Sequence, residues 1–396
     1  MVVQRRLSLA VVSALALVLA AAAPMGAATK EVKPSPLRSA NLVRVKDIAT
    51  NGVIKPGVVA VGYHEAANPA QLYVAWSVNG GSDYRKANGN LRRYRIVGEP
   101  SLGMSVAVCA GRVWVATAWR HPSDRAGDSD VILTSRTIAG GAAQAFMTKR
   151  TGNHRVRDVS VTCVSGKLLA VGWLQKDRTK TSAKLMLRSV EPLGTTPSYK
   201  RTLDLGKAEF QGGMALASTP AQAAVAFVRG GDLRLHRLAI KGGKAGLSNQ
   251  KTIVWNDVKH PVMATKGDRL VVAYSDAGRV KAKTSKDLGT SYSKPHVLAK
   301  PGGTKNPSRP YSVDVVGNRI VTTAGIYSAA AGRVTPKRIS SSDFGGSWKT
   351  ASFGNVGARV AALLKVKGQG PLLMEAWHNN APKGYSDTLR ARYELK

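Results

Sequence analysis

The pattern that decides the fold is LAVGW at residues 169–173, a short apolar run that ends in a small residue and an aromatic one. Related runs recur along the chain: YVAW at residues 73–76, VATAW at 115–119, AVAF at 224–227, VVAY at 271–274, a degraded TTAG at 322–325 and LMEAW at 373–377. Successive small residues of these runs lie 43 to 54 positions apart. A period near 50 residues is typical of one four-stranded blade of a β-propeller.

Each copy of the pattern has similar neighbours. A second β-like run and a tight turn precede it, as in SVAVCAG at 105–111, and a third run such as DVILTSR at 130–136 follows it. Short runs bounded by Gly, Asn, Asp and Ser, without a long segment of helical period, indicate an all-β chain. Seven copies of about 50 residues fill residues 29–396, whereas six blades would need about 61 residues each. The sequence therefore predicts a seven-bladed β-propeller, with six blades as the alternative.

The chain ends on a third strand, so the last blade lacks an outer strand of its own. LVRVK at residues 42–46 is a candidate for the missing strand. We expect this segment to pair with the C-terminal strand and close the ring, because closure removes exposed sheet edges.

Two turns after predicted third strands carry a specific motif. Residues 341–348, SSDFGGSW, fit S-x-D-x-G-x-x-W, and residues 285–292, SKDLGTSY, fit it with Tyr in place of Trp. The Asp carboxylate can accept backbone N–H groups of its turn, and Gly permits a positive φ. The motif positions are Ser285, Asp287, Gly289 and Tyr292 in one copy and Ser341, Asp343, Gly345 and Trp348 in the other.

These turns resemble the Asp-box, or BNR, repeat of the sialidase superfamily, where the motif is structural. The resemblance implies a propeller fold and a structural role for Asp287 and Asp343. A third segment, residues 77–84, looks similar but begins one residue after the Trp76 marker, whereas Asp287 and Asp343 follow their markers by 13 and 18 residues. On that ground we set residues 77–84 aside as out of phase.

The first 28 residues have the features of an export signal. Arg5 and Arg6 precede an apolar run at 7–23, and small residues follow at 26–28. We therefore expect a signal peptide at 1–28, a linker at 29–41 and the propeller at 42–396. Beyond residue 28 no stretch approaches the roughly 20 apolar residues of a membrane span. The prediction is a secreted monomer, either released or held non-covalently at the cell surface.

The only two cysteines, Cys109 and Cys163, are 54 residues apart, which is one repeat. In an oxidising compartment they are candidates for a disulfide between neighbouring blades, with two buried free thiols as the alternative. Neither has the spacing of a metal site.

The charge balance points to anionic partners. The chain has 59 Lys and Arg against 23 Asp and Glu, a formal net charge of +36. Such an excess favours attraction to polyanions. The local concentration that we select as a polyanion-binding site comprises Arg85, Lys86, Arg92, Arg93 and Arg95. No reading helix or aromatic pair of an RNA-binding motif is visible, so sequence-specific nucleic-acid recognition is not expected.

The resemblance to sialidases also implies where an active site would lie. Those enzymes use an arginine triad, a Tyr nucleophile assisted by Glu, and an Asp acid/base. Here Arg120 would be a triad arginine, and Asp124 or Asp128 the acid/base. However, Arg359 stands where the Tyr is expected, and an arginine cannot attack an anomeric carbon. No basic residue occurs near positions 103–104, where a second triad arginine would fall.

Asp124, Asp128 and Asp130 form the one tight acidic cluster. A solvated loop that offsets nearby arginines is the interpretation we favour, with a Ca²⁺ site as the alternative. No metal site or cofactor motif is predicted. The sequence therefore favours an exported cationic propeller that binds an anionic surface or extracellular polymer, or a protein partner, without catalysis. The alternative is an exo-sialidase-like glycoside hydrolase with a divergent site.

Overall fold

The computed structural model describes residues 37–50, 57–65, 71–79, 84, 92–96, 103–120, 129–141, 144–149, 154–165, 168–177, 183–191, 198–219, 222–241, 244–247, 251–300, 308–328, 333–352, 356–364, 372–379 and 386–394. Every regular element in these ranges is a β-strand. Accordingly, the described residues contain no helix of the length and apolarity needed to cross a membrane.

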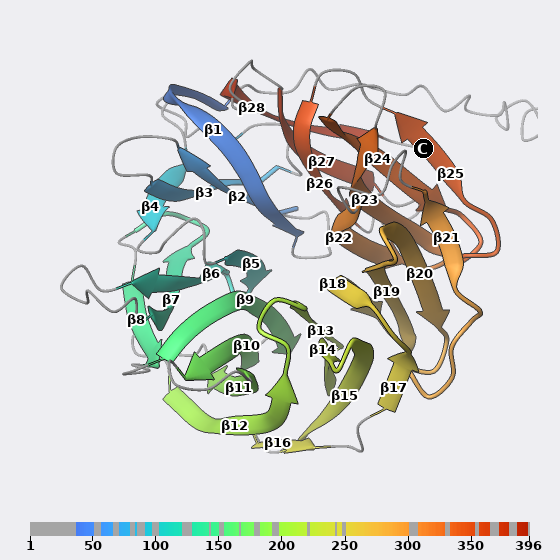
Figure 1. The fold of residues 1–396 in the computed structure, drawn as a ribbon. Helices are drawn as coiled ribbons and strands as arrows, with labels where there is room; N and C mark the ends of the chain where they lie inside the picture. Colours follow the sequence, from blue (N-terminus) through green and yellow to red (C-terminus); the bar gives the residue numbers. More distant parts are fainter. Residues whose placement is uncertain are drawn as a thin grey trace, which may run out of the picture.

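The strands form sheets arranged in a ring (Figure 1), and a central channel runs between them. One sheet, which we call the closing sheet, has the order β26 (Val356–Leu364), β27 (Leu372–Asn379), β28 (Ser386–Glu394), β1 (Leu37–Thr50), β2 (Val59–Glu65), β3 (Gln71–Ser77) and β4 (Arg93–Ile96). The next sheets are β5 (Met104–Cys109), β6 (Arg112–Arg120), β7 (Ser129–Thr137) and β8 (Gln144–Lys149), then β9 (His154–Ser165), β10 (Leu168–Asp177), β11 (Ala183–Glu191) and β12 (Ser198–Ala208).

Three further sheets complete the ring. They are β13 (Met214–Ser218), β14 (Gln222–Arg229), β15 (Asp232–Lys241), β16 (Lys244–Leu247) and β17 (Lys251–Val254); β18 (Val258–Lys266), β19 (Arg269–Asp276), β20 (Arg279–Ser285) and β21 (His296–Ala299); and β22 (Arg309–Val316), β23 (Arg319–Ser328), β24 (Arg333–Ser341) and β25 (Lys349–Ser352). The strands of each described sheet pair antiparallel with their neighbours.

The described strands thus make six hydrogen-bonded sheets, which matches the six-blade alternative, and the predicted seven separate blades are not confirmed. The reason lies at the ends of the ring. β1 pairs with β2 on one side and with β28 on the other, at Leu37 with Leu389 and Val43 with Ser386, so the first and last repeats share one sheet. The expected pairing of residues 42–46 with the C-terminal strand is confirmed at Val43. The strand also includes residues 37–41, which we had placed in the linker.

The recurring marker occupies the second strand of its sheet at Trp119, Trp173, Phe227 and Tyr274, but the assignment of its first copy was wrong. Trp76 lies on β3, the third strand, and the residue on the second strand is Tyr63 in VAVGY at 59–63. Two adjacent apolar runs that both end in an aromatic explain the error.

The small residue of the marker makes room for the next sheet. A Cβ at Gly62 would lie 2.6 Å from Cε of Met104, and a Cβ at Gly172 would lie 2.8 Å from Cε of Met214. Met104 and Met214 open the channel-lining strands of the following sheets. Gly at these two positions therefore leaves room for the flexible end of the methionine side chain of the next sheet.

Candidate functional site

The central channel has a volume of about 1240 Å³ and is lined by one strand from each of seven repeats, namely β1, β5, β9, β13, β18, β22 and β26. Contacts between neighbours follow the same order along both strands: on β5 and β9, Ser105 meets Val161 and, further along, Cys109 meets Cys163. The lining strands are therefore parallel. We call the end where they begin the upper rim and the end where they finish the lower rim.

Short polar side chains join the lining strands. Asp47 Oδ2 accepts the N–H of Val106 at 2.8 Å, and Asp314 Oδ2 accepts that of Leu363 at 2.7 Å. Ser105 accepts the N–H of Val161 in the same way. These hydrogen bonds join lining strands of neighbouring sheets, which are not paired through backbone hydrogen bonds as the strands within one sheet are. Burial raises the pKa of Asp47 and of Asp314 to about 6, although the backbone donors oppose that shift.

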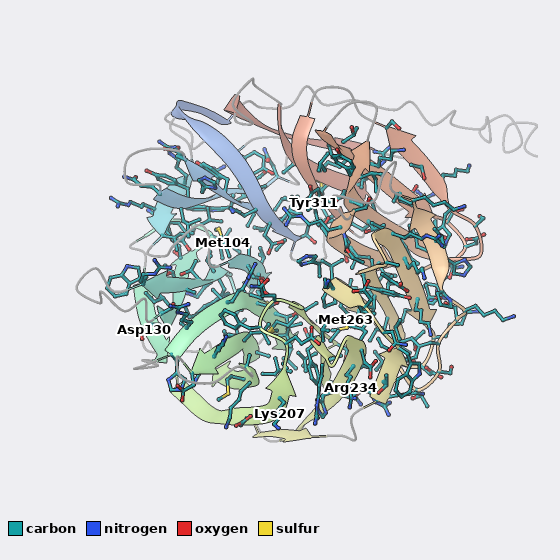
Figure 2. All side chains as sticks on the ribbon, in the orientation of Figure 1. Met104, Asp130, Lys207, Arg234, Met263 and Tyr311 are labelled. Atoms are coloured by element: carbon teal, nitrogen blue, oxygen red, sulfur yellow. A yellow bond between two sulfur atoms is a disulfide. The ribbon has the colours of Figure 1, made fainter. Side chains whose placement is uncertain are left out.

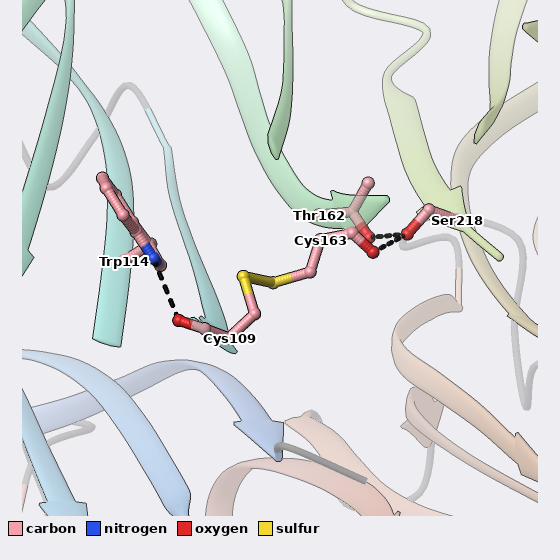
Figure 3. The surroundings of a disulfide bond; sticks show 5 residues. All are labelled: Cys109, Trp114, Thr162, Cys163 and Ser218. Carbon is pink, nitrogen blue, oxygen red and sulfur yellow. Dashed lines mark hydrogen bonds between the residues drawn. A yellow bond between two sulfur atoms is a disulfide. The ribbon is translucent and has the colours of Figure 1, made fainter. Parts of the chain in front are cut away.

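At the lower rim Cys109 and Cys163 form a disulfide between β5 and β9, with 6.2 Å between their Cα atoms (Figure 3). It is the pairing that the repeat spacing suggested. Trp114 Nε1 donates to the carbonyl of Cys109 at 3.3 Å, and the hydroxyl of Ser218 on β13 donates to the carbonyl of Cys163. The three lining strands β5, β9 and β13 are thereby linked at one level.

Cations from three sheets converge at the upper rim. Arg157 on β9, Lys259 on β18 and Arg309 on β22 all lower the pKa of His260, which burial and these charges together bring to about 4. Burial is the larger cause. His260 is therefore neutral at pH 7, and its surroundings carry positive potential.

Carboxylates at the rim offset part of this charge. Arg157 lies 3.9 Å from Asp158, and Lys259 lies 3.4 Å from Asp257. Arg309 is exposed above the ring of Tyr311, 5.4 Å from its centroid, and has no ion pair among the residues that the structure describes. Desolvation raises the pKa of Asp158 to about 6, so this carboxylate is easily neutralised.

Irregular backbone turns side chains toward this rim. The pairing register shifts around Lys46 in β1, around Asp158 in β9, between Lys259 and Val262 in β18, and around Tyr311 in β22. Lys46, Asp158, His260 and Tyr311 all line the channel, and Figure 2 shows Tyr311 beside its opening. Bulges of this kind re-aim side chains and are frequent next to functional sites.

Two glycines directly before neighbouring strands leave room for the bulges. Asp158 and His260 have φ of 52°, in the left-handed region. A Cβ at Gly103 would lie 3.3 Å from the nitrogen of Val159, and one at Gly213 would lie 3.2 Å from Cα of His260. The same construction thus appears twice at the upper rim.

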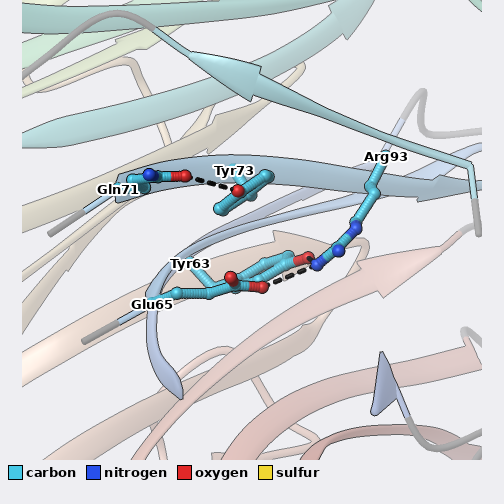
Figure 4. A network of polar contacts seen from close by, with 5 residues as sticks. All are labelled: Tyr63, Glu65, Gln71, Tyr73 and Arg93. Atoms are coloured by element: carbon cyan, nitrogen blue, oxygen red, sulfur yellow. Dashed lines mark hydrogen bonds and ion pairs between the residues drawn. The ribbon is translucent and has the colours of Figure 1, made fainter. Parts of the chain in front are cut away.

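The predicted polyanion-binding group is only partly described, and one member is placed differently from the prediction. The guanidinium of Arg93 contacts Glu65 Oε1 at 2.6 Å and the hydroxyl of Tyr63 at 3.3 Å, beside the stacked rings of Tyr63 and Tyr73 (Figure 4). The guanidinium of Arg93 is therefore held in an ion pair and a hydrogen bond inside the closing sheet. Arg95 is exposed and Arg92 half-buried on the same segment, and Arg85 and Lys86 lie outside the described residues.

This network is no sialidase-like Tyr and Glu pair at the channel. Tyr63 and Glu65 are 1% and 2% exposed and do not line the cavity. Burial raises the pKa of Tyr63 to about 12, so its phenol stays protonated.

The other residues suggested by the resemblance are scattered. Arg120 is exposed at the end of β6, while Asp124 and Asp128 lie outside the described residues. Asp130 is on β7, 7% exposed and away from the channel, so the interpretation of it as part of a solvated loop was wrong (Figure 2). Arg359 is on β26, opposite Trp377. Among the described residues no group of three or more His, Cys, Asp or Glu side chains is placed to hold a metal ion.

The Asp boxes are closed turns at the lower side, after β20 and β24. Asp343 Oδ1 accepts the hydroxyl of Ser341 at 2.7 Å and the N–H of Ser347 at 2.9 Å, and Asp343 Oδ2 accepts the hydroxyl of Ser347. Asp287 has the same contacts with Ser285 and Ser291. The serine donors hold the pKa of both carboxyls well below the usual range.

The segment that we set aside, residues 77–84, begins in the same way. Ser77 ends the third strand β3, its hydroxyl contacts Asn79 Oδ1 at 2.6 Å, and the N–H of Asn79 contacts that hydroxyl at 3.3 Å. Its rejection as out of phase followed from the misplaced Trp76 marker and was wrong.

The upper-rim residues were not predicted from the sequence. No motif includes Arg157, Lys259, His260 or Arg309. A usable signal was present, since His260 and Arg309 each precede a proline at the start of a lining strand. A basic residue before proline is biased away from helix and suits a bulged strand entry.

No protein-family model matches the sequence, and no curated protein is significantly similar to it. Solved structures with a similar fold include Trypanosoma rangeli sialidase with sialic acid, at 13% identity and a TM-score of 0.46, with 79% of this chain and 56% of that chain covered. The α-L-arabinofuranosidase Arb93A from Fusarium graminearum matches at 13% identity and 0.48, with 78% and 93% covered. The fucose-specific lectin from Aleuria aurantia matches at 10% and 0.46, with 78% and 95% covered. Likeness at this level identifies no activity.

Proposed function

We propose that this protein binds an anionic polymer, whose negatively charged groups are held at the upper rim by Arg157, Lys259 and Arg309. The observation that carries the proposal is geometric: the three cations come from three sheets and each lies at or next to a bulge whose residues line the mouth of the channel. Their combined effect on the pKa of His260 agrees with this convergence. Side chains brought together from distant parts of the chain on bulged strands form a prepared site rather than a scattered basic surface.

The overall charge fits the same role. A net charge of +36 attracts a polyanion over a distance and speeds its encounter with the rim. The leader-like residues 1–28 support an exported protein that would meet extracellular polymers. Asp158 and Asp257 offset part of the local positive charge. Binding at the rim is expected to be salt-sensitive, because each neutralised anionic group of the polymer releases counterions.

The test is retention of the full chain on immobilised heparin over a salt gradient. Replacing Arg157, Lys259 and Arg309 together by Gln should lower the eluting salt concentration clearly. The control replaces Lys286, Lys294 and Lys349, three exposed lysines remote from the channel, and removes the same charge. It should shift elution much less. Equal shifts for the two triple variants would show that only net charge matters and would contradict the rim site.

An enzymatic role would give a different result. A sialidase-like hydrolase would turn over a fluorogenic sialoside, and turnover would disappear with Arg120→Ala while surviving the rim substitutions. Such turnover would replace the binding-only proposal.

A further inference from the structure

One aromatic side chain is exposed on the rim side of the molecule without an evident structural role. Trp255 is 68% exposed, whereas Trp76, Trp114 and Trp173 are each at most 1% exposed. The other large apolar side chains that stand out from the described surface are Val297 and Val334, which are not aromatic. Leaving an indole in water forgoes about 2 kcal/mol or more of burial energy, so its position calls for an explanation.

The backbone that carries Trp255 is fixed on both sides. Before it, Val254 pairs with Leu233 at the end of β17 and is buried. After it, the N–H of Asn256 donates to Asp232 Oδ1 at 3.1 Å, and the N–H of Val258 donates to the carbonyl of Gly231 at 2.9 Å. The ring is therefore presented to solvent from a held turn, which lowers the entropy cost of binding a ligand on it.

Trp255 belongs to the connection that leads into the upper rim. It lies four residues before Lys259 and five before His260, so its Cα is within about 14 Å of that of Lys259. On its other side Lys283 donates to the carbonyl of Ile253 at 2.8 Å. The backbone at Trp255 therefore lies between Ile253, which Lys283 contacts, and Lys259, the nearest of the rim cations along the chain.

We infer that Trp255 is a stacking platform that makes the rim specific for an acidic polysaccharide. The electron-rich face of an indole attracts the polarised C–H groups on the apolar face of a sugar ring. Lys259 and the arginines would then hold carboxylate or sulfate groups of the same or the next sugar. This inference rests on the proposed function and adds the chemical class of the polymer.

The number of exposed aromatics favours a polysaccharide over a single-stranded nucleic acid. Proteins that hold single strands stack successive bases on successive aromatic side chains. Trp255 is the one aromatic among the markedly exposed large apolar side chains of the described residues. A single ring suits a polymer that alternates one stacked sugar with charged groups along its chain.

The experiment measures the affinity of the folded full chain for three probes: polygalacturonate oligomers, inorganic polyphosphate, and oligothymidylate. Trp255→Ala should weaken polygalacturonate binding about tenfold, as truncation of a central tryptophan commonly does. Binding of polyphosphate, which has no ring, should stay within about twofold. Trp255→Phe should retain most of the affinity, and Val297→Ala, which removes another exposed apolar group, should change neither.

Each outcome separates the two claims. If neither polygalacturonate nor polyphosphate binds, the proposed function itself fails. If both bind and Trp255→Ala weakens them equally or not at all, the rim site stands and the stacking platform is refuted. If oligothymidylate binds more tightly than polygalacturonate and loses affinity with Trp255→Ala, the ligand is a nucleic acid. As a direct check, polygalacturonate should protect the tryptophan fluorescence of the wild-type protein from quenching by acrylamide. In the Trp255→Phe variant, quenching should be the same with and without polygalacturonate.

Discussion

Carboxylates have different roles in two regions of this propeller, the Asp-box turns and the wall of the channel. In the Asp boxes Asp287 and Asp343 are exposed, accept bonds from serines up to four residues away, and have lowered pKa values. In the channel wall Asp47 and Asp314 are half-buried, accept N–H groups 49 to 59 residues away, and have pKa values raised to about 6 by desolvation. The boxes close turns within a sheet, whereas the wall carboxylates hold one sheet to the next.

The comparison shows what decides the pKa of an aspartate here. Both sets accept two or more hydrogen bonds, and these favour the charged form. In the wall, desolvation outweighs them, while in the exposed boxes it does not. Ionisation of the carboxylate therefore destabilises the folded state in the wall and stabilises it in the boxes.

The largest effect on stability is expected from removing the disulfide that joins two strands of the channel wall. Replacing Cys109 and Cys163 together by Ser should lower the free energy of unfolding by about 2 to 5 kcal/mol, because the disulfide closes a long loop. Chemical denaturation under non-reducing conditions measures this. An unchanged midpoint would show that the hydrogen-bonded contacts alone hold β5 to β9.

The next effect concerns a wall carboxylate. Asp314→Ala should cost about 2 kcal/mol, since it leaves the N–H groups of Leu363 and Val315 without their acceptor. The folded pKa lies above the unfolded value, so the stabilisation by Asp314 is greatest below about pH 4 and declines as pH rises through 6. The gap between wild type and variant should therefore be wider at pH 5 than at pH 8. A wider gap at pH 8 would contradict the raised pKa.

The box carboxylates should show the reverse dependence and a smaller effect. Asp343→Ala should lower the melting temperature by a few degrees at pH 7, through loss of the contacts with Ser341 and Ser347. Because the folded pKa is lowered, this stabilisation is present above about pH 4 and disappears as pH falls below it. Wild type and variant should thus converge in acid, and retention on heparin should not change. Loss of retention at an unchanged melting temperature would assign the box to ligand binding.

The two regions also differ in what the sequence could reveal. The boxes are local, so eight consecutive residues specify both the turn and its hydrogen bonds, and Asp287 and Asp343 were placed correctly. The wall contacts join residues about 50 positions apart, and no local motif around Asp47 or Asp314 indicates them. The rim cations were missed for the same reason, because bulges in separate strands bring Arg157 and Arg309 together only in the folded ring.

The errors in the repeat assignment have a local cause. The run YVAW on β3 fits the marker pattern as well as the true second-strand run, VAVGY on β2, does. Choosing YVAW shifted the assignment of the first repeat by one strand. That choice also hid the turn at Ser77. The number of separate sheets depended on whether β1 joins β28, β2 or both, which a repeat length cannot tell.

The smallest effect concerns the third raised carboxylate, Asp158, which is at the rim rather than in the wall. Its pKa of about 6 means that it loses most of its charge between pH 7 and pH 5, while Arg157, Lys259 and Arg309 remain charged. His260, with a pKa of about 4, stays neutral over this range in the free protein. Losing one negative charge near the ligand should strengthen heparin binding about threefold to fivefold at pH 5 relative to pH 7. Asp158→Asn should bind at pH 7 as wild type does at pH 5 and should lose most of the pH dependence. If the variant keeps the full dependence, another group controls the rim, and His260 shifted upward by the bound polyanion is the first to examine by NMR titration.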